Sequence, residues 1–222
     1  MTGSKALALE DLCKSRGQAF LRFDYRGHGA SSQAFKEGCI GDWADDALKV
    51  LDRLSEGPQV LVGSSMGGWI MLLTALARPD RVAGLVGIAP APDFTEALIW
   101  QELTERQRQK VLADGFVEIP SDYGDQPYVI TKRLIEDGRE RLILNKGPLP
   151  IRMPVRIIQG MEDKDVPWRT ALAIRDTVES ADVEITLVKN GGHRLSEPND
   201  LERLTRTVAA LLDQVENDAN PG

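Results

Sequence analysis

Residues 63–67 read Gly-Ser-Ser-Met-Gly and fit the pattern G-x-S-x-G, with Ser65 at its centre. The motif lies between two apolar runs, residues 60–62 and 69–77, which we expect to form a strand and a helix. A serine on so sharp a turn exposes its hydroxyl, and the helix amino terminus offers backbone N–H groups to an oxyanion. The motif therefore predicts that Ser65 is a nucleophile and that the N–H of Met66 lies in an oxyanion hole. The alternative is a glycine-rich turn with incidental serines.

A serine hydroxyl is a weak nucleophile and needs a base, usually an imidazole that a carboxylate orients. The chain has two histidines. Where G-x-S-x-G joins a strand to a helix, the catalytic residues follow the order nucleophile, acid, histidine along the chain. His193, in Asn-Gly-Gly-His-Arg at 190–194, is the histidine that follows Ser65, so we predict that it is the base. His28 either lines the pocket or belongs to a structural turn.

The acid should lie in the loop Gly-Met-Glu-Asp-Lys-Asp-Val-Pro at residues 160–167, which follows a predicted strand. The loop holds three carboxylates. Asp163 fits best because it follows Gly160 by three residues and precedes Val-Pro. Asp165 is the alternative and Glu162 comes third. The alternative is that all three carboxylates are solvated charges of a loop and have no catalytic role.

The remaining sequence favours no other chemistry. The formal charge is −7 and no basic stripe is interleaved with aromatic residues, so nucleic acid is not an expected partner. Cys13, Cys39 and two distant histidines give no metal-ligand spacing, and the glycine-rich loop lacks the lysine of a phosphate-binding loop. We expect no metal and no cofactor. No apolar run of about 18 residues and no secretion signal occur, so we expect a cytoplasmic protein without stable membrane insertion.

Strand and helix patterns alternate along the chain, which predicts an α/β fold with a doubly wound, mainly parallel sheet. Strands are expected at residues 19–25, 60–62, 82–89, 155–159 and 183–188, and helices at residues 4–15, 42–54, 69–77, 168–179 and 200–215. Residues 91–150 break this rhythm with two charged helical stretches around a polar turn region at 121–128. We therefore predict one domain over residues 1–222, with a helical cap inserted at 91–150.

The predicted cap contains apolar side chains that suit an acyl chain. We predict that Trp100, Phe94 and Leu98 bind substrate, together with Ile99, Phe116, Tyr123 and Tyr128. The alternative is that they pack the cap onto the body of the protein.

Three segments carry a resemblance to the α/β-hydrolase fold: Phe-Asp-Tyr-Arg-Gly-His-Gly at 23–29, Gly-Ser-Ser-Met-Gly-Gly-Trp at 63–69, and residues 160–168. They are most similar to the palmitoyl-protein thioesterase and acyl-glucuronide esterase branch, which is mitochondrial in animals and has bacterial relatives. The resemblance is weakest over residues 91–150. It implies a serine hydrolase whose partner is a small ester, a thioester or an acylated protein. It also implies a mitochondrial location if the source is eukaryotic and the amino terminus is missing.

The resemblance further implies that Ser65 attacks the carbonyl, His193 moves the proton and Asp163 orients the imidazole. One feature departs from that family. A second oxyanion donor normally comes from a loop after a strand that precedes the first helix, and this sequence enters that helix almost at once. We expect that the sheet lacks N-terminal strands and that the chain starts at an internal methionine. Loss of one oxyanion donor lowers turnover by about 10² to 10³. The alternative is therefore a non-catalytic binding protein of this fold, or an inactive protein truncated at its amino terminus.

Overall fold

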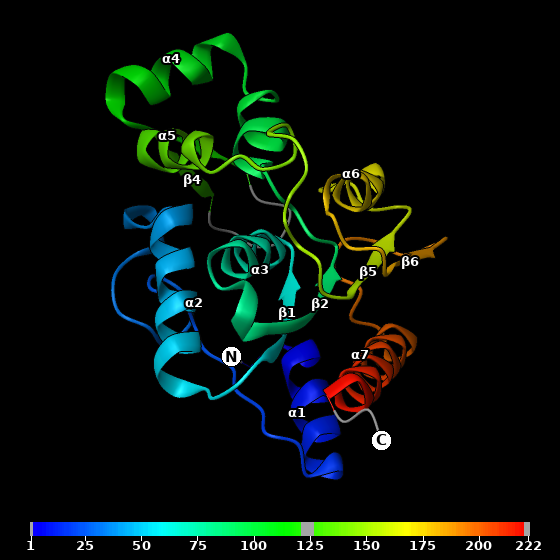
Figure 1. The fold of residues 1–222 in the computed structure, drawn as a ribbon. Coiled ribbons are helices and arrows are strands. Elements are labelled where there is room, and N and C mark those ends of the chain that lie inside the picture. Colours follow the sequence, from blue (N-terminus) through cyan, green and yellow to red (C-terminus); the bar gives the residue numbers. More distant parts are fainter. Residues whose placement is uncertain (1, 121–126, 220–222) are drawn as a thin grey trace.

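The computed structural model describes residues 2–120 and 127–219 and centres on a sheet of parallel strands (Figure 1). The strands are β1 (Gln59–Ser64), β2 (Val82–Ile88), β5 (Val155–Gly160) and β6 (Val183–Val188), in the order β1-β2-β5-β6. All three pairings are parallel, so the carboxyl ends of these strands share one edge. The predicted α/β fold with a mainly parallel sheet is confirmed.

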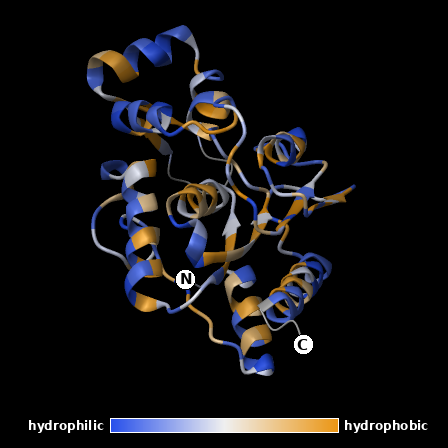
Figure 2. Cartoon of the chain, viewed as in Figure 1, coloured by the Kyte–Doolittle hydropathy of each residue, from blue (hydrophilic) through white to orange (hydrophobic). Residues whose placement is uncertain are grey.

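Helices cover both faces of this sheet because neighbouring residues of a strand point to opposite sides. Leu85 and Ile157 pack on one face with α2 (Ile40–Leu54), α3 (Met66–Ala77) and α6 (Arg169–Thr177). Val86 and Ile158 pack on the other face with α1 (Ser4–Arg16) and α7 (Pro198–Ala219). Figure 2 shows the matching pattern, with hydrophobic colour on the strands and on α3. The sheet is thus doubly wound.

The predicted strand at residues 19–25 is wrong. These residues form no ladder with any described strand, although their composition favours one. A cavity of about 1090 Å³ is lined by residues 18–23 and Tyr25 on one side and by Val60, Leu61 and Val62 of β1 on another. The segment therefore lies too far from β1 to pair with it, and a strand without a ladder is not part of a sheet.

The predicted cap segment (residues 91–150) contains more strand structure than the sequence indicated. A π-helical turn (Thr95–Trp100) and α4 (Glu105–Asp114) precede an antiparallel hairpin of β3 (Phe116–Ile119) and β4 (Tyr128–Thr131), and α5 (Lys132–Glu140) follows. Five buried side chains form a separate small core: Leu103, Val111, Val117, Ile130 and Ile135. The polar turn region expected at 121–128 contains the start of β4, and residues 121–126, with Tyr123, lie outside the described chain.

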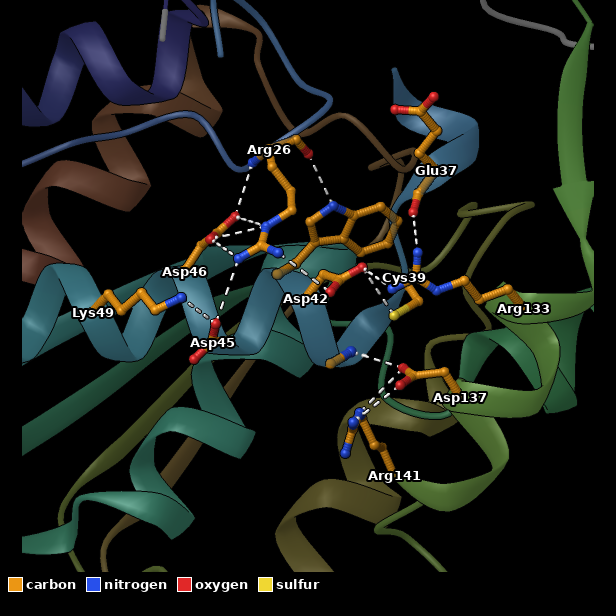
Figure 3. Close-up of polar contacts among 12 residues, drawn as sticks. Arg26, Glu37, Cys39, Asp42, Asp45, Asp46, Lys49, Arg133, Asp137 and Arg141 are labelled. Carbon is orange, nitrogen blue, oxygen red and sulfur yellow. Dashed lines mark hydrogen bonds and ion pairs between the residues drawn. The ribbon is translucent and has the colours of Figure 1, made fainter. Parts of the chain in front are cut away.

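The cap segment is joined to the body through α2 (Figure 3). Asp137 on α5 accepts a 2.7 Å hydrogen bond from the backbone N–H of Gly41 in the first turn of α2. Arg133, also on α5, lies 2.7 Å from a carboxylate oxygen of Asp42. At the base of the segment, buried Asp93 accepts hydrogen bonds from the N–H groups of residues 143 and 144 at 2.8 and 2.9 Å. The segment is thus held at both its base and its side.

Short 3₁₀ turns complete the described secondary structure at Phe35–Glu37 and Pro79–Arg81. Among residues 2–120 and 127–219, no helix combines the length and the apolar character needed to cross a membrane.

Candidate active site

Ser65 lies at the carboxyl end of β1, on the turn into α3. Its backbone angles are φ 54° and ψ −121°, a strained conformation for a residue with a side chain. Two backbone hydrogen bonds fix this turn: the Ser65 N–H donates to the carbonyl of Ile88 at 2.9 Å, and the Ser65 carbonyl accepts from the N–H of Ala91 at 3.1 Å. Ile88 is the last residue of β2 and Ala91 lies three residues later. The neighbouring strand and the loop after it therefore hold the serine in its strained conformation.

Glycines allow the close approach that this turn needs. A Cβ atom at Gly63 would lie 2.3 Å from the carbonyl oxygen of Gly67, and one at Gly68 would lie 2.5 Å from Cβ of Pro90. Gly67 is less constrained, since the nearest atom to its Cβ position is the hydroxyl of Tyr25 at 3.9 Å. Packing thus requires Gly63 of the motif and Gly68, which follows the motif, whereas Gly67 of the motif faces more open space.

The structure brings Ser65, His193 and Asp163 into one hydrogen-bonded line. Oγ of Ser65 lies 2.9 Å from Nε2 of His193, and Nδ1 of His193 lies 2.9 Å from Oδ2 of Asp163. The Asp163 side chain is completely buried and that of His193 is 17% exposed. Because an ionised carboxylate only accepts hydrogen bonds, Nδ1 carries the proton and Nε2 is left to accept from the serine hydroxyl.

The loops that carry the acid and the histidine pack directly on each other. A Cβ at Gly160 would lie 2.3 Å from the carbonyl oxygen of Gly191, and the N–H of Glu162 donates to that oxygen at 2.9 Å. On the far side of the histidine, the ammonium of Lys5 on α1 donates to the carbonyl of Arg194. The loop of His193 is therefore held between the acid loop and α1.

Four donors surround the Asp163 carboxylate. Oδ1 accepts from the N–H groups of Asp165 and Val166, each at 2.9 Å. Oδ2 accepts from His193 and from the side-chain amide of Gln159, also at 2.9 Å. Burial by itself raises the pKa of Asp163, but the hydrogen bonds from His193 and the loop outweigh it, so the pKa lies below its ordinary value of 3.8. This carboxylate is ionised at neutral pH.

Sequence reasoning missed Gln159. It is the last residue of the strand predicted at 155–159, where it was given no role, and it is completely buried. The available signal in the sequence was a polar residue at the carboxyl end of a predicted strand, four residues before the candidate acid. A polar side chain that a strand buries needs a hydrogen-bond partner.

The alternative carboxylate, Asp165, donates its backbone N–H to Asp163. Its own carboxylate also lies near, since ligand atoms of Asp163, Asp165 and His193 fall within 4.8 Å of one another. Such a group has metal-ligand character, but Asp163 and His193 use those atoms in a hydrogen bond to each other. The arrangement suits proton transfer better than metal binding.

Met66 is the first residue of α3, so its N–H belongs to the helix turn in which backbone N–H groups have no helical acceptor. It directly follows Ser65, and the positive end of the helix dipole lies beside the serine hydroxyl. The position is suited to an oxyanion donor.

The predicted substrate residues are partly engaged in packing. The ring of Phe94 packs edge-on against Trp69, with 5.6 Å between ring centroids. The guanidinium groups of Arg139 and Arg108 lie 4.5 and 5.7 Å from the ring centroid of Trp100. Leu98, on the same π-helical turn, is half-buried. Their part in substrate binding stays a prediction.

His28 makes no hydrogen bond to Ser65, His193 or Asp163. Its Nδ1 lies 3.2 Å from the carbonyl of Arg26, and its ring packs edge-on against Trp43 and Phe35 at 5.1 and 5.3 Å. The contacts favour the structural interpretation of this histidine.

Comparisons with known proteins identify the family of this chain. Residues 5–117 match the sequence pattern of the alpha/beta hydrolase fold family. The palmitoyl-protein thioesterase ABHD10, a mitochondrial protein of Bos taurus, is 41% identical over 218 residues, which cover 97% of this chain and 70% of the bovine protein. A solved structure of alpha/beta hydrolase domain-containing protein 10 from mouse superposes with a TM-score of 0.88 at 40% identity, covering 97% of this chain and 86% of that one.

A second solved structure, a putative hydrolase from Agrobacterium vitis S4, superposes with a TM-score of 0.91 at 43% identity and covers 95% of this chain and 83% of that chain. The family pattern spans half of the chain, and the bovine relative is matched over more than two thirds of its length. The chain therefore belongs to the α/β hydrolase family.

Proposed function

We propose that the protein is a serine hydrolase that cleaves carboxylic esters or thioesters through an acyl-enzyme, with Ser65, His193 and Asp163 as its catalytic residues. The line of two 2.9 Å contacts from Ser65 Oγ through the His193 ring to Asp163 Oδ2 is the observation that carries the proposal. A strained serine, a base within hydrogen-bond reach and a buried acid that orients the base are the features of an activated nucleophile.

The reaction uses each of these groups in turn. Ser65 Oγ attacks the carbonyl carbon while Nε2 of His193 accepts the hydroxyl proton. The N–H of Met66 stabilises the oxyanion of the tetrahedral intermediate. The imidazolium then protonates the leaving thiolate or alkoxide, and water attacks the acyl-enzyme with His193 again as the base.

The substrate class is proposed from relatives. The bovine and human relatives, 41% and 39% identical, are named palmitoyl-protein thioesterases, so we propose acylated cysteines or small acyl conjugates such as acyl glucuronides. A more distant relative is named 2-hydroxymuconate semialdehyde hydrolase and is 27% identical over 211 residues. The nearer relatives favour thioester and ester cleavage over carbon–carbon cleavage.

The cap segment is proposed to lie over the serine within a single domain of residues 1–222. Its own small core and its attachment to α2 support a lid that Phe94, Leu98 and Trp100 line for an acyl chain. A screen of p-nitrophenyl esters and thioesters from acetyl to palmitoyl measures this directly, because an apolar lid favours the longer chains.

The location is proposed from the same relatives. Their names assign those proteins to mitochondria, which gives no support to a cytoplasmic location. For a eukaryotic source we propose the mitochondrion, and cell fractionation with an antibody to the native protein tests it.

The experiment that decides the function is labelling with a fluorophosphonate, which reacts only with an activated hydroxyl. We expect one label per chain, on Ser65, and loss of both labelling and p-nitrophenyl ester hydrolysis in Ser65→Ala. Ser64→Ala is the matched control, since it removes the neighbouring hydroxyl and should keep both. A wild-type protein that is folded but takes no label would instead be a non-catalytic binding protein.

A further inference from the structure

Gln159 is a buried polar residue in the mainly apolar strand β5, which also contains Arg156. The residues before it in β5 include Val155, Ile157 and Ile158, all in the hydrophobic core, and Gln159 is itself 0% exposed. Its Oε1 atom has no hydrogen-bond partner among the described residues. Burying an unpaired amide oxygen costs free energy that an apolar side chain would not. Another contribution of the side chain must offset that cost.

The amide nitrogen of Gln159 has three acceptors around it. Nε2 lies 2.9 Å from Oδ2 of Asp163, 3.2 Å from the carbonyl oxygen of Val166 and 3.4 Å from that of Gly160. A flipped amide would place Oε1 against three acceptors, so this orientation is fixed by the neighbours. One side chain therefore holds both the carboxylate of Asp163 and the backbone three residues later.

Oδ2 of Asp163 is the same oxygen that faces Nδ1 of His193. The loop N–H groups hold only Oδ1, so without Gln159 the carboxylate could rotate about that anchor.

We propose that Gln159 is a positioning residue of the site, whose amide fixes the Oδ2 atom of Asp163 in line with His193. The inference rests on the proposed function, in which Asp163 orients the base. Gln159 touches neither the serine nor the space in which a substrate reacts. Its effect passes through Asp163 and His193.

The test is Gln159→Met, which keeps the length of the side chain and removes the amide N–H that donates to Asp163. We expect the fluorophosphonate labelling rate and kcat to fall about tenfold, as loss of one hydrogen bond to a charged group implies. We also expect the acidic limb of the pH–rate profile to move down by roughly half to one pH unit, because a carboxylate turned out of line with the ring stabilises the imidazolium less. A role in packing alone would lower Tm and the active fraction without moving that limb.

Gln214→Met is the matched control. The Gln214 amide also donates to a carboxylate, Asp182, at 2.8 Å, but on the far side of the protein at the junction of α7 and β6. We expect this variant to lose stability and keep the wild-type pH profile.

Gln159→Glu is a second variant of the same shape, in case the methionine variant does not fold. Two carboxyl groups sharing a site repel each other when both ionise, so we expect its labelling rate to fall with rising pH where the wild-type rate rises. Wild-type pH profiles in both Gln159 variants would overturn the inference while leaving the proposed function intact. Failure of the wild-type protein to take the label would overturn both.

Discussion

The Asp163 carboxylate accepts two hydrogen bonds on each oxygen, which fills its acceptor sites. An asparagine at this position presents an NH₂ group either to the loop N–H donors or to the histidine. In the second orientation it favours the ring tautomer in which Nε2 carries the proton and cannot accept one from Ser65. We therefore expect Asp163→Asn to lower kcat by about 10³ to 10⁴, measured with a p-nitrophenyl ester.

The lowered pKa of Asp163 bears on the pH profile of the wild-type protein and on the stability of the fold. A carboxyl whose folded pKa lies below 3.8 is ionised throughout the range above about pH 5, so titration of Asp163 itself should not change kcat of the wild-type protein between pH 5 and 9. The same shift stabilises the fold above the unfolded pKa, and this contribution disappears as pH falls through the folded pKa. Asp165→Asn is the control and should keep most of the activity. A larger loss in Asp165→Asn than in Asp163→Asn would transfer the acid role to Asp165.

The backbone at Ser65 shows why the residue and the strand beside it act together. A positive φ at a residue with a side chain costs about 1 to 3 kcal/mol. The hydrogen bonds from Ser65 to Ile88 and Ala91 supply contacts that offset this cost. The reactive position thus depends on β2 as much as on the motif itself.

At the scale of elements, α2 receives its amino-terminal partner from another part of the chain. Its N-cap residue, Cys39, makes no side-chain cap to the backbone of the helix, and Asp137 of α5 accepts from the N–H of Gly41 instead (Figure 3). The carboxylate also lies at the positive end of the helix dipole. Asp137 therefore joins the cap segment to α2 in the body of the protein.

We expect Asp137→Asn to lower the free energy of unfolding by about 1 to 2 kcal/mol, as loss of a helix cap does. Urea unfolding followed by circular dichroism measures the change. Glu136→Gln is the matched control on the same helix, because its exposed carboxylate pairs with Lys132 at 3.7 Å and should contribute under about 0.5 kcal/mol. Equal losses in the two variants would show that Asp137 is an ordinary surface charge.

At the scale of the whole molecule, a cavity of about 1090 Å³ is lined by residues 18–23, by Tyr25 and by residues of β1. Its walls are mainly apolar and include Leu9, Ile70 and Leu212 from helices on both faces of the sheet. Val62 on the edge of β1 is 37% exposed. No strand ladder among the described residues holds residues 19–23 in place, so this region should open at lower free energy than the paired strands.

Hydrogen exchange followed by mass spectrometry tests that expectation. Peptides covering residues 19–23 should exchange on the order of 10² times faster than peptides covering β2, which is paired on both sides and buried. Protection of residues 19–23 equal to that of β2 would mean that the segment is paired in solution by something beyond the described residues.

The sequence by itself determined the class of fold and predicted the pair Ser65 and His193, which the structure brings within hydrogen-bond distance. Short apolar runs followed by amphipathic helices predict parallel strands wherever they occur, because that periodicity reflects burial on both faces. The glycines in and directly after the serine motif predicted the sharp turn. The structure agrees at Gly63 and Gly68, where a residue with a side chain would not fit. The order of residues along the chain singled out His193 and a loop with three carboxylates.

Tertiary structure decided what local patterns do not encode. The fold of the loop after β5 aims Asp163 at His193 and buries it, whereas the spacing of Asp163 and Asp165 is nearly equivalent in the sequence. Residues 19–25 have the composition of a strand but no neighbour within reach, because pairing depends on a second segment. Gln159 was hidden for the same reason: its partner is a carboxylate that only the folded loop brings to it.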